Sequence, residues 1–144
     1  MKRILFSIGS TFVLFFAAVT ANGTIDDALS FALEAAIPAV KEGFTVREEY
    51  WGGDLPSKQP KPIAHQLFKG NEYWFWMGTD VKGARISVHV YDNTGKLAED
   101  DSWQKGPKAA VHIRPKRTGT YYLLVEIEKS PEERTTWSLA YGFR

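Results

Sequence analysis

The first periodic pattern of apolar residues along the chain has helical spacing. It comprises Ile25, Leu29, Ala32, Leu33, Ala36 and Val40, while Asp27, Ser30, Glu34 and Lys41 fall on the opposite side. This pattern predicts one amphipathic helix over about residues 25–42. Thr24 and the acids that follow it are typical of a helix start, and Gly43 is a natural stop.

After Gly43 the apolar positions recur at every second residue, which is the period of a β-strand. Seven such segments are separated by turn residues: 44–51, 63–69, 72–79, 84–92, 109–114, 120–129 and 135–143. Apart from Pro38, every proline falls between them, where the ladder needs no backbone donor. Short, regular segments of this kind predict an all-β fold, an antiparallel β-sandwich of about seven or eight strands with one N-terminal helix.

The segments at 72–79 and 84–92 predict a β-hairpin whose faces can be assigned residue by residue. Residues 80–83 form its loop, so that Thr79 pairs with Ala84. Alternation with polar residues turns one side of each strand toward the core. The predicted inner face consists of Tyr73, Phe75, Met77, Ile86, Val88 and Val90.

The other face of this hairpin carries two tryptophans, which is unusual for a surface exposed to water. The predicted register places Trp74 beside His89, with Trp76 and Tyr91 on the same face. Exposed aromatic patches are typical of contact surfaces, and such side chains stack on sugar rings or hold a partner peptide. These four residues are the predicted ligand-binding site. The alternative is that the helix at 25–42, or another strand, covers the tryptophans.

The first 21 residues have the three parts of a secretory signal peptide. Lys2 and Arg3 precede an apolar run at 4–19, and small residues suit cleavage after Ala21 or Gly23. The run is shorter than the ~20 residues that span a bilayer. The sequence therefore predicts a signal peptide at 1–21, an N-terminal helix segment at 22–43, a β-sandwich domain at 44–144, and a periplasmic or secreted location.

Composition narrows the classes of partner. The 144 residues include no cysteine, and 18 Lys and Arg against 17 Asp and Glu give a net charge of +1. The length fits one domain, and the absence of cysteine excludes disulfides and cysteine nucleophiles. A near-neutral chain gives no electrostatic reason to expect nucleic acid. Arg114, Lys116 and Arg117 form a basic cluster, which is interpreted as a solvated turn because no stacking residues alternate with it.

No enzyme motif stands out. The chain has no Gly-x-Ser-x-Gly, no His-Glu-x-x-His and no glycine-rich phosphate loop. Glu126 and Glu128 share one strand face at roughly 6.6 Å between Cα atoms, a separation that glycosidase carboxylates use. A solvated strand end is the simpler interpretation, so the prediction is a non-enzyme without catalytic residues.

Metal and cofactor binding have equally simple alternatives. Asp92, Asn93, Glu99, Asp100 and Asp101 flank one loop with oxygen ligands of the kind that calcium prefers. The Asp-x-x-Gly at 92–95 is also what an ordinary hairpin turn requires. The three histidines lack the spacing of a zinc site. The sequence therefore predicts no metal site and no cofactor.

Three segments follow one another in an order known from a protein family: 67–73, 90–97 and 115–125, with Asp101 between the last two. Together they resemble the bacterial pre-peptidase C-terminal domain, over about residues 52–143. The resemblance implies a jelly-roll-like β-sandwich that accompanies secreted enzymes. It also implies a non-catalytic role in binding substrates or surfaces, with calcium in some members. In this chain an N-terminal helix stands where the family has an enzyme domain.

The sequence thus predicts an exported, stand-alone binding module for envelope or extracellular polysaccharide. Its ligand site is predicted at Trp74, Trp76, His89 and Tyr91. The alternative is a protein-interaction or structural subunit of an envelope complex. A small glycoside hydrolase is a third possibility.

Overall fold

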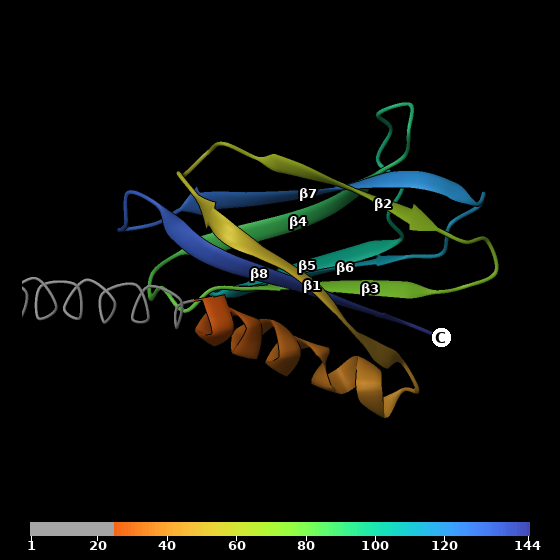
Figure 1. Cartoon of the computed structure of the whole chain (residues 1–144), viewed down its shortest axis with the longest axis horizontal. Helices are drawn as coiled ribbons and strands as arrows, with labels where there is room; N and C mark the ends of the chain where they lie inside the picture. Colours follow the sequence, from red (N-terminus) through yellow and green to blue (C-terminus); the bar gives the residue numbers. More distant parts are fainter. Residues whose placement is uncertain (1–24) are drawn as a thin grey trace, which may run out of the picture.

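The computed structural model describes residues 25–144, which form two β-sheets packed face to face with one helix outside them (Figure 1). The signal peptide predicted at 1–21 lies outside the described residues. The strands are β1 (Thr45–Leu55), β2 (Lys61–Leu67), β3 (Tyr73–Gly78), β4 (Arg85–Tyr91), β5 (Asp101–Lys105), β6 (Lys108–Ile113), β7 (Gly119–Lys129) and β8 (Thr135–Phe143). The predicted antiparallel sandwich with an N-terminal helix is confirmed.

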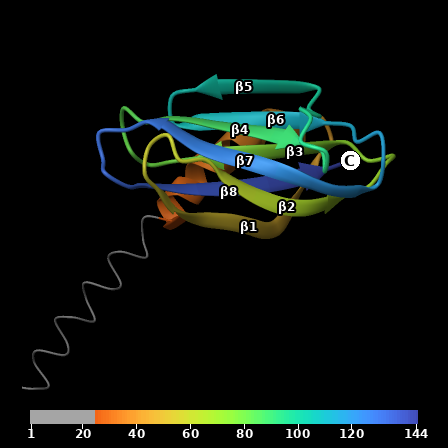
Figure 2. The same cartoon turned by 90° about the horizontal axis from the view of Figure 1, so that it is seen from above.

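The strands divide into a five-stranded sheet of order β1-β8-β3-β6-β5 and a three-stranded sheet of order β2-β7-β4. Seen from above, β1 and β5 form the two margins of the larger sheet (Figure 2). The core lies between the sheets, where Phe75 and Leu139 from one face Val88 and Val125 from the other. Burial of this apolar layer is the main stabilising term of the fold.

The predicted hairpin of 72–79 and 84–92 is wrong. β3 pairs with β6 and β8, whereas β4 pairs with β7, so the loop after Thr79 carries the chain from one sheet to the other. The predicted inner faces are nevertheless correct, because both sets of apolar side chains are buried in the same core. They meet across the sandwich instead of side by side in one sheet.

The strand missing from the sequence prediction is β5. Its side chains are mostly exposed, so Asp101–Lys105 shows no apolar alternation that would reveal it. Charged residues at such a margin are common because they discourage pairing with another chain. Gln104 connects β5 to β4 of the other sheet, because its Nε2 donates a hydrogen bond of 2.6 Å to the carbonyl oxygen of Ile86.

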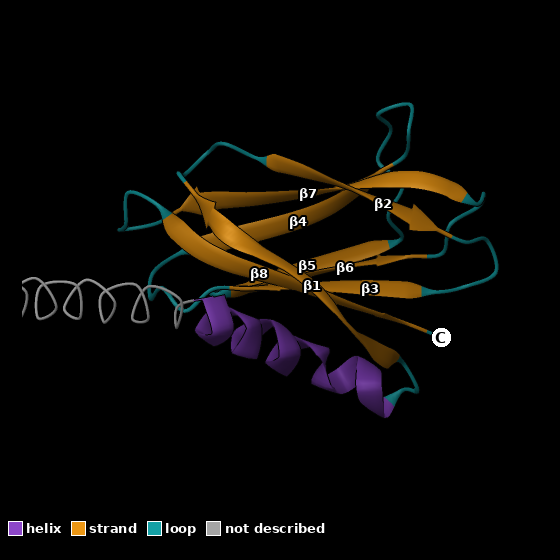
Figure 3. Ribbon diagram, in the orientation of Figure 1, coloured by secondary structure: helices purple, strands orange, loops and turns teal. Residues whose placement is uncertain are grey.

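The helical residues 25–41 lie on the outer face of the five-stranded sheet, away from the smaller sheet (Figure 3). Gly43, with φ of +100°, occupies the left-handed region that ends the helix, as predicted. No helix within 25–144 is long and apolar enough to cross a membrane. The buried side of the helix consists of Ala28, Ala32, Ala35, Ala36 and Ala39.

This contact is close because the helix packs its alanines on the sheet and the sheet has a glycine, Gly78, opposite the helix backbone. A Cβ added at Gly78 would lie 2.4 Å from the Ala32 nitrogen and 2.5 Å from the Ala28 carbonyl oxygen. The larger residues of the predicted apolar stripe do not fit, so Leu33 and Val40 are 42% and 48% exposed. The predicted stripe is therefore correct in part: Ala32 and Ala36 are buried and Leu29 packs against them, whereas Leu33 and Val40 face solvent.

Replacing Gly78 with Ala should force the helix away from the sheet. We expect the free energy of unfolding in urea to fall by at least about 2 kcal/mol, because the added methyl meets backbone that cannot move aside. Gly119→Ala is the matched control, since a Cβ there meets nothing within 4 Å. Equal stability of the two variants would contradict the close helix–sheet contact.

Candidate functional site

The four residues of the predicted ligand site do not share a surface. Trp76 is 1% exposed and packs under the helix, which confirms for this residue that the helix is its cover. Trp74 is half-buried and its ring lies 4.9 Å from that of His112. His89 and Tyr91 alternate with core residues of β4, so they lie on the outer face of the other sheet. The predicted contact of Trp74 with His89 was wrong because β3 and β4 are not neighbours.

Glu72 joins the start of β3 to β6 and to the end of the chain. Its carboxylate accepts hydrogen bonds from His112 Nε2, from Arg144 Nε at 2.9 Å and from Arg114 Nη2 at 3.1 Å. Burial raises the pKa of this carboxyl, but the hydrogen bonds from Arg144 and His112 and the charge of Arg114 lower it overall. With its oxygens engaged in this way, Glu72 serves as a structural clamp.

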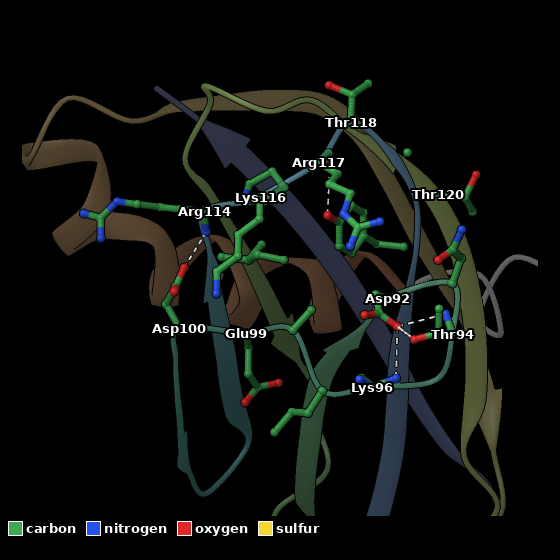
Figure 4. A pocket seen from close by; sticks show the side chains of 17 residues that line it. Asp92, Thr94, Lys96, Glu99, Asp100, Arg114, Lys116, Arg117, Thr118 and Thr120 are labelled. Atoms are coloured by element: carbon green, nitrogen blue, oxygen red, sulfur yellow. Dashed lines mark hydrogen bonds between the residues drawn. The ribbon is translucent and has the colours of Figure 1, made fainter.

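One hollow of about 450 Å³ lies at the end of the sandwich, between the loop after β4 and the loop after β6 (Figure 4). We call it the loop pocket; its walls are residues 92–100, without Gly95, and residues 113–121. It contains four of the five residues considered as calcium ligands. The carboxylates of the three acids among them accept hydrogen bonds from backbone N–H groups and so stabilise the loops.

Asp92 accepts hydrogen bonds from the backbone N–H of Thr94 at 2.9 Å and of Lys96 at 3.0 Å, and from the Thr94 hydroxyl. The hydrogen bond from the Thr94 hydroxyl lowers the pKa of the Asp92 carboxyl most, and the backbone N–H groups of Lys96 and Thr94 lower it further. Asp100 accepts one from the backbone N–H of Arg114. Across residues 25–144, no group of three or more His, Asp or Glu is placed to hold a metal ion.

A second hollow, of about 330 Å³, opens where the margins of the two sheets separate, between β1 and β2. We call it the aromatic groove. Four strands and the β2–β3 loop contribute to it. Its lining residues are Arg47, Glu49, His65, Gln66, Phe68, Asn71, Tyr73, Tyr141 and Phe143.

The floor of the aromatic groove is part of a continuous stack of rings. Tyr141 stacks on Phe75 with centroids 5.4 Å apart, and Phe143 lies 6.4 Å from Tyr73. Phe68, on the loop after β2, is 49% exposed at the rim. The loop is fixed because the Tyr73 hydroxyl oxygen accepts hydrogen bonds from the Phe68 N–H and from Asn71 Nδ2.

The polar wall of the groove comes from an irregularity in β1. The pairing register with β8 shifts between Val46 and Tyr50, which is the position of a β-bulge. Arg47 and Glu49 lie in this bulge, with Arg47 Nη2 3.8 Å from Glu49 Oε1. The Arg47 guanidinium carbon also lies 5.7 Å from the centroid of the Phe143 ring. The bulge thus places both charges beside the aromatic floor.

His65 forms the inner end of the groove. Its ring packs edge-on against Trp51 at 5.2 Å and Tyr141 at 4.9 Å. Burial lowers the pKa of His65, although the Glu49 charge opposes the effect. The imidazole is therefore neutral at pH 7 and has one donor and one acceptor nitrogen.

Sequence reasoning missed the groove because its aromatic residues lie in predicted strands, where an aromatic residue at the margin of a sheet has the same pattern as a core residue. One signal was available. Arg47, Glu48 and Glu49 are three consecutive charged residues inside a predicted strand, and such a run interrupts the alternation as a bulge does.

The carboxylates considered for glycoside hydrolysis lie elsewhere. Glu128 on β7 accepts a hydrogen bond from Arg85 Nε at 3.1 Å. Burial raises its pKa, but hydrogen bonds from Gln104 and Ser87 and the Arg85 charge lower it overall. A general acid needs the opposite shift. Glu126 and Glu128 therefore provide no support for a hydrolase.

Replacing Glu72 with Gln should destabilise the protein by roughly 1–2 kcal/mol at pH 7, because the buried His112 and the more exposed guanidinium groups of Arg114 and Arg144 lose the carboxylate that they share. A lowered carboxyl pKa stabilises the fold above the ordinary glutamate range, and this stabilisation is lost as the pH falls through the lowered value. The difference from wild type should therefore shrink in acid. Urea unfolding between pH 7 and pH 3 measures it, with the exposed Glu132→Gln as control. A difference independent of pH would contradict the charged clamp.

No protein family model matches the chain, and no curated protein matches it. The resemblance of segments 67–73, 90–97 and 115–125 to the pre-peptidase C-terminal domain remains a prediction. The functional assignment therefore depends on the geometry of the two hollows, and of these the aromatic groove has the clearer chemistry.

Proposed function

We propose that this protein is an exported, non-catalytic binding module for polysaccharide and that the aromatic groove is its ligand site. One observation carries the proposal: rings that range from the exposed Phe68 to the buried Tyr73 and Tyr141 form an open groove together with planar polar side chains. A sugar ring has apolar C–H faces and a rim of hydroxyl groups. Aromatic faces beside amide, carboxylate and guanidinium groups are complementary to both.

Each part of the groove has a defined role in this proposal. Phe68 at the rim is the exposed ring on which a sugar stacks, while Tyr141 and Phe143 form the apolar floor. Arg47 and Glu49 provide donors and acceptors on one wall, and Gln66 provides both on the other. A site open along its length accepts a chain that continues beyond the bound sugar.

A binding role fits the groove better than hydrolysis does. Its lining includes one carboxylate, that of Glu49, whereas glycoside hydrolysis generally uses two on opposite sides of the bond. Glu49 is exposed and its Oε1 lies 3.8 Å from Arg47 Nη2, so the charged group beside it in the groove is a cation and not a second carboxylate. The groove supplies shape and hydrogen bonds without an acid–base pair.

The alternative role in protein interaction is supported by the outer side of the helix. Leu33, Ile37 and Val40 are 42%, 49% and 48% exposed and recur at intervals of four and three residues. This spacing gives a short apolar stripe of the kind that packs against another helix. The stripe makes a structural subunit the second candidate.

Replacing Phe68 with Ala should weaken binding to polysaccharide about tenfold, the loss expected for one stacking ring. Native electrophoresis through gels containing soluble polysaccharides from the cell envelope and the exterior measures the retardation. Tyr122→Ala is the matched control, since this tyrosine is exposed on the outer face of the smaller sheet. Equal retardation of Phe68→Ala and wild type would contradict the groove as the site.

If no polysaccharide retards the wild-type protein in these gels, the proposal that it binds glycans is wrong. The second candidate has its own expected result: Leu33→Ser/Ile37→Ser should then abolish capture of the protein's partner from an envelope extract, whereas Phe68→Ala should not.

A further inference from the structure

The loop pocket lies beside the aromatic groove, and we infer that it binds the anionic group of the same ligand. The polysaccharide is then an acidic one, with carboxylate or sulfate groups along its chain. This inference rests on the proposed function and names its substrate class. It depends on the charges in the pocket and on the position of the pocket beside the groove.

In the part of the chain that the structure describes, three cations of the loop pocket are held by no salt bridge, although, besides the Thr94 hydroxyl, the charge of Lys96 contributes to lowering the pKa of Asp92. Lys96, Lys116 and Arg117 line it, and none of them forms an ion pair with a carboxylate anywhere in residues 25–144. Figure 4 shows Lys116 and Arg117 extending from the β6–β7 loop toward the loop that carries Asp92. Their charges therefore remain available to a ligand.

The acids of the pocket keep their negative charge, but each is held in place by a fixed donor, and none of them forms a salt bridge with these cations. Asp92 and Asp100 accept backbone N–H groups, as described above. Glu99 accepts the Val90 N–H at 3.0 Å and lies 3.0 Å from His89 Nδ1, on the outer side of β4. A carboxylate satisfied by backbone donors competes weakly for a lysine in water.

The pocket also offers a hydroxyl donor. Thr118 accepts the Lys69 N–H through its hydroxyl oxygen at 2.9 Å, so its own O–H can donate to a ligand. Thr120 is a second exposed hydroxyl of the lining. Flexible cations with neutral donors suit a carboxylate or sulfate on a sugar, which presents hydroxyl groups beside its charge.

The two hollows are adjacent across one strand pair. His65 of the aromatic groove and Tyr121 of the loop pocket are cross-strand partners in the β2–β7 ladder. Phe68 and Lys69 follow β2 directly, and the bond from Lys69 to Thr118 joins their loop to the pocket. A glycan chain stacked on Phe68 therefore meets cations when it continues over this wall. A neutral glycan would leave them without partners.

A glycan array that carries uronic-acid, sulfated and matching neutral oligosaccharides tests the inference on the purified protein. We expect retention of acidic oligosaccharides at least tenfold above their neutral counterparts in low salt. Lys116→Glu/Arg117→Glu should abolish this preference, because two attractive charges near the ligand become repulsive. High salt should reduce it as well.

Lys82→Glu/Lys129→Glu is the matched control with the same change in net charge. Lys129 ends β7 and pairs with Arg85, so both substitutions lie at the end of the sandwich away from Gly119. The control should keep the preference for acidic ligands. Lys116→Gln/Arg117→Gln removes the charges without reversing them and should weaken acidic binding less, with unfolding temperatures unchanged.

The two proposals fail in distinguishable ways. Equal retention of acidic and neutral oligosaccharides, with loss in Phe68→Ala, overturns the anion site and leaves the groove proposal intact. An equal loss in both charge-reversed variants overturns it too, because that result reflects net charge alone. Retention of no oligosaccharide overturns both proposals.

Discussion

The close contact between the helix at 25–41 and the five-stranded sheet is the constraint on which the rest of the structure depends. It exists because Gly78 leaves room for the helix backbone at Ala32. Docked at this distance, the helix buries Trp76 on the outer face of the sheet. The chain leaves the helix directly into β1, whose bulge carries Arg47 and Glu49 to the aromatic groove. Helix docking thus positions one wall of the candidate site.

The two hollows of this molecule lie at a margin and at the loops rather than on the broad faces of the sheets. The inner faces form the core, and much of one outer face lies under the helix. Where β1 and β2 separate, however, core rings such as Tyr141 line an open hollow. The loop pocket lies beside it, across the ladder that joins His65 to Tyr121. The open margin between β1 and β2 and the neighbouring loops can therefore present aromatic and charged groups side by side.

Alternation along the chain was enough to predict the core residues of the segments 72–79 and 84–92, because a half-buried strand must turn every second side chain inward. It could not predict which strands are neighbours, and Phe75 shows why. An inward-facing ring satisfies the same pattern whether its strand pairs with β4 or with β6 and β8. β5 escaped prediction because its exposed side chains carry no such pattern. The groove escaped it because Tyr141 and Phe143 look like core residues until the margin of the sheet is known.

In the binding mode that we propose, the ligand extends from the aromatic groove to the loop pocket. Backbone amide chemical shifts, followed by NMR during titration with the acidic oligosaccharide that binds most tightly, test it most directly. We expect the largest changes in chemical shift at residues 47–49, 65–71 and 116–120, and we expect all of them to saturate with the same dissociation constant. Shifts concentrated around Trp74 and His112 on the outer face of the larger sheet, or along Leu33 and Ile37 of the helix, would contradict it.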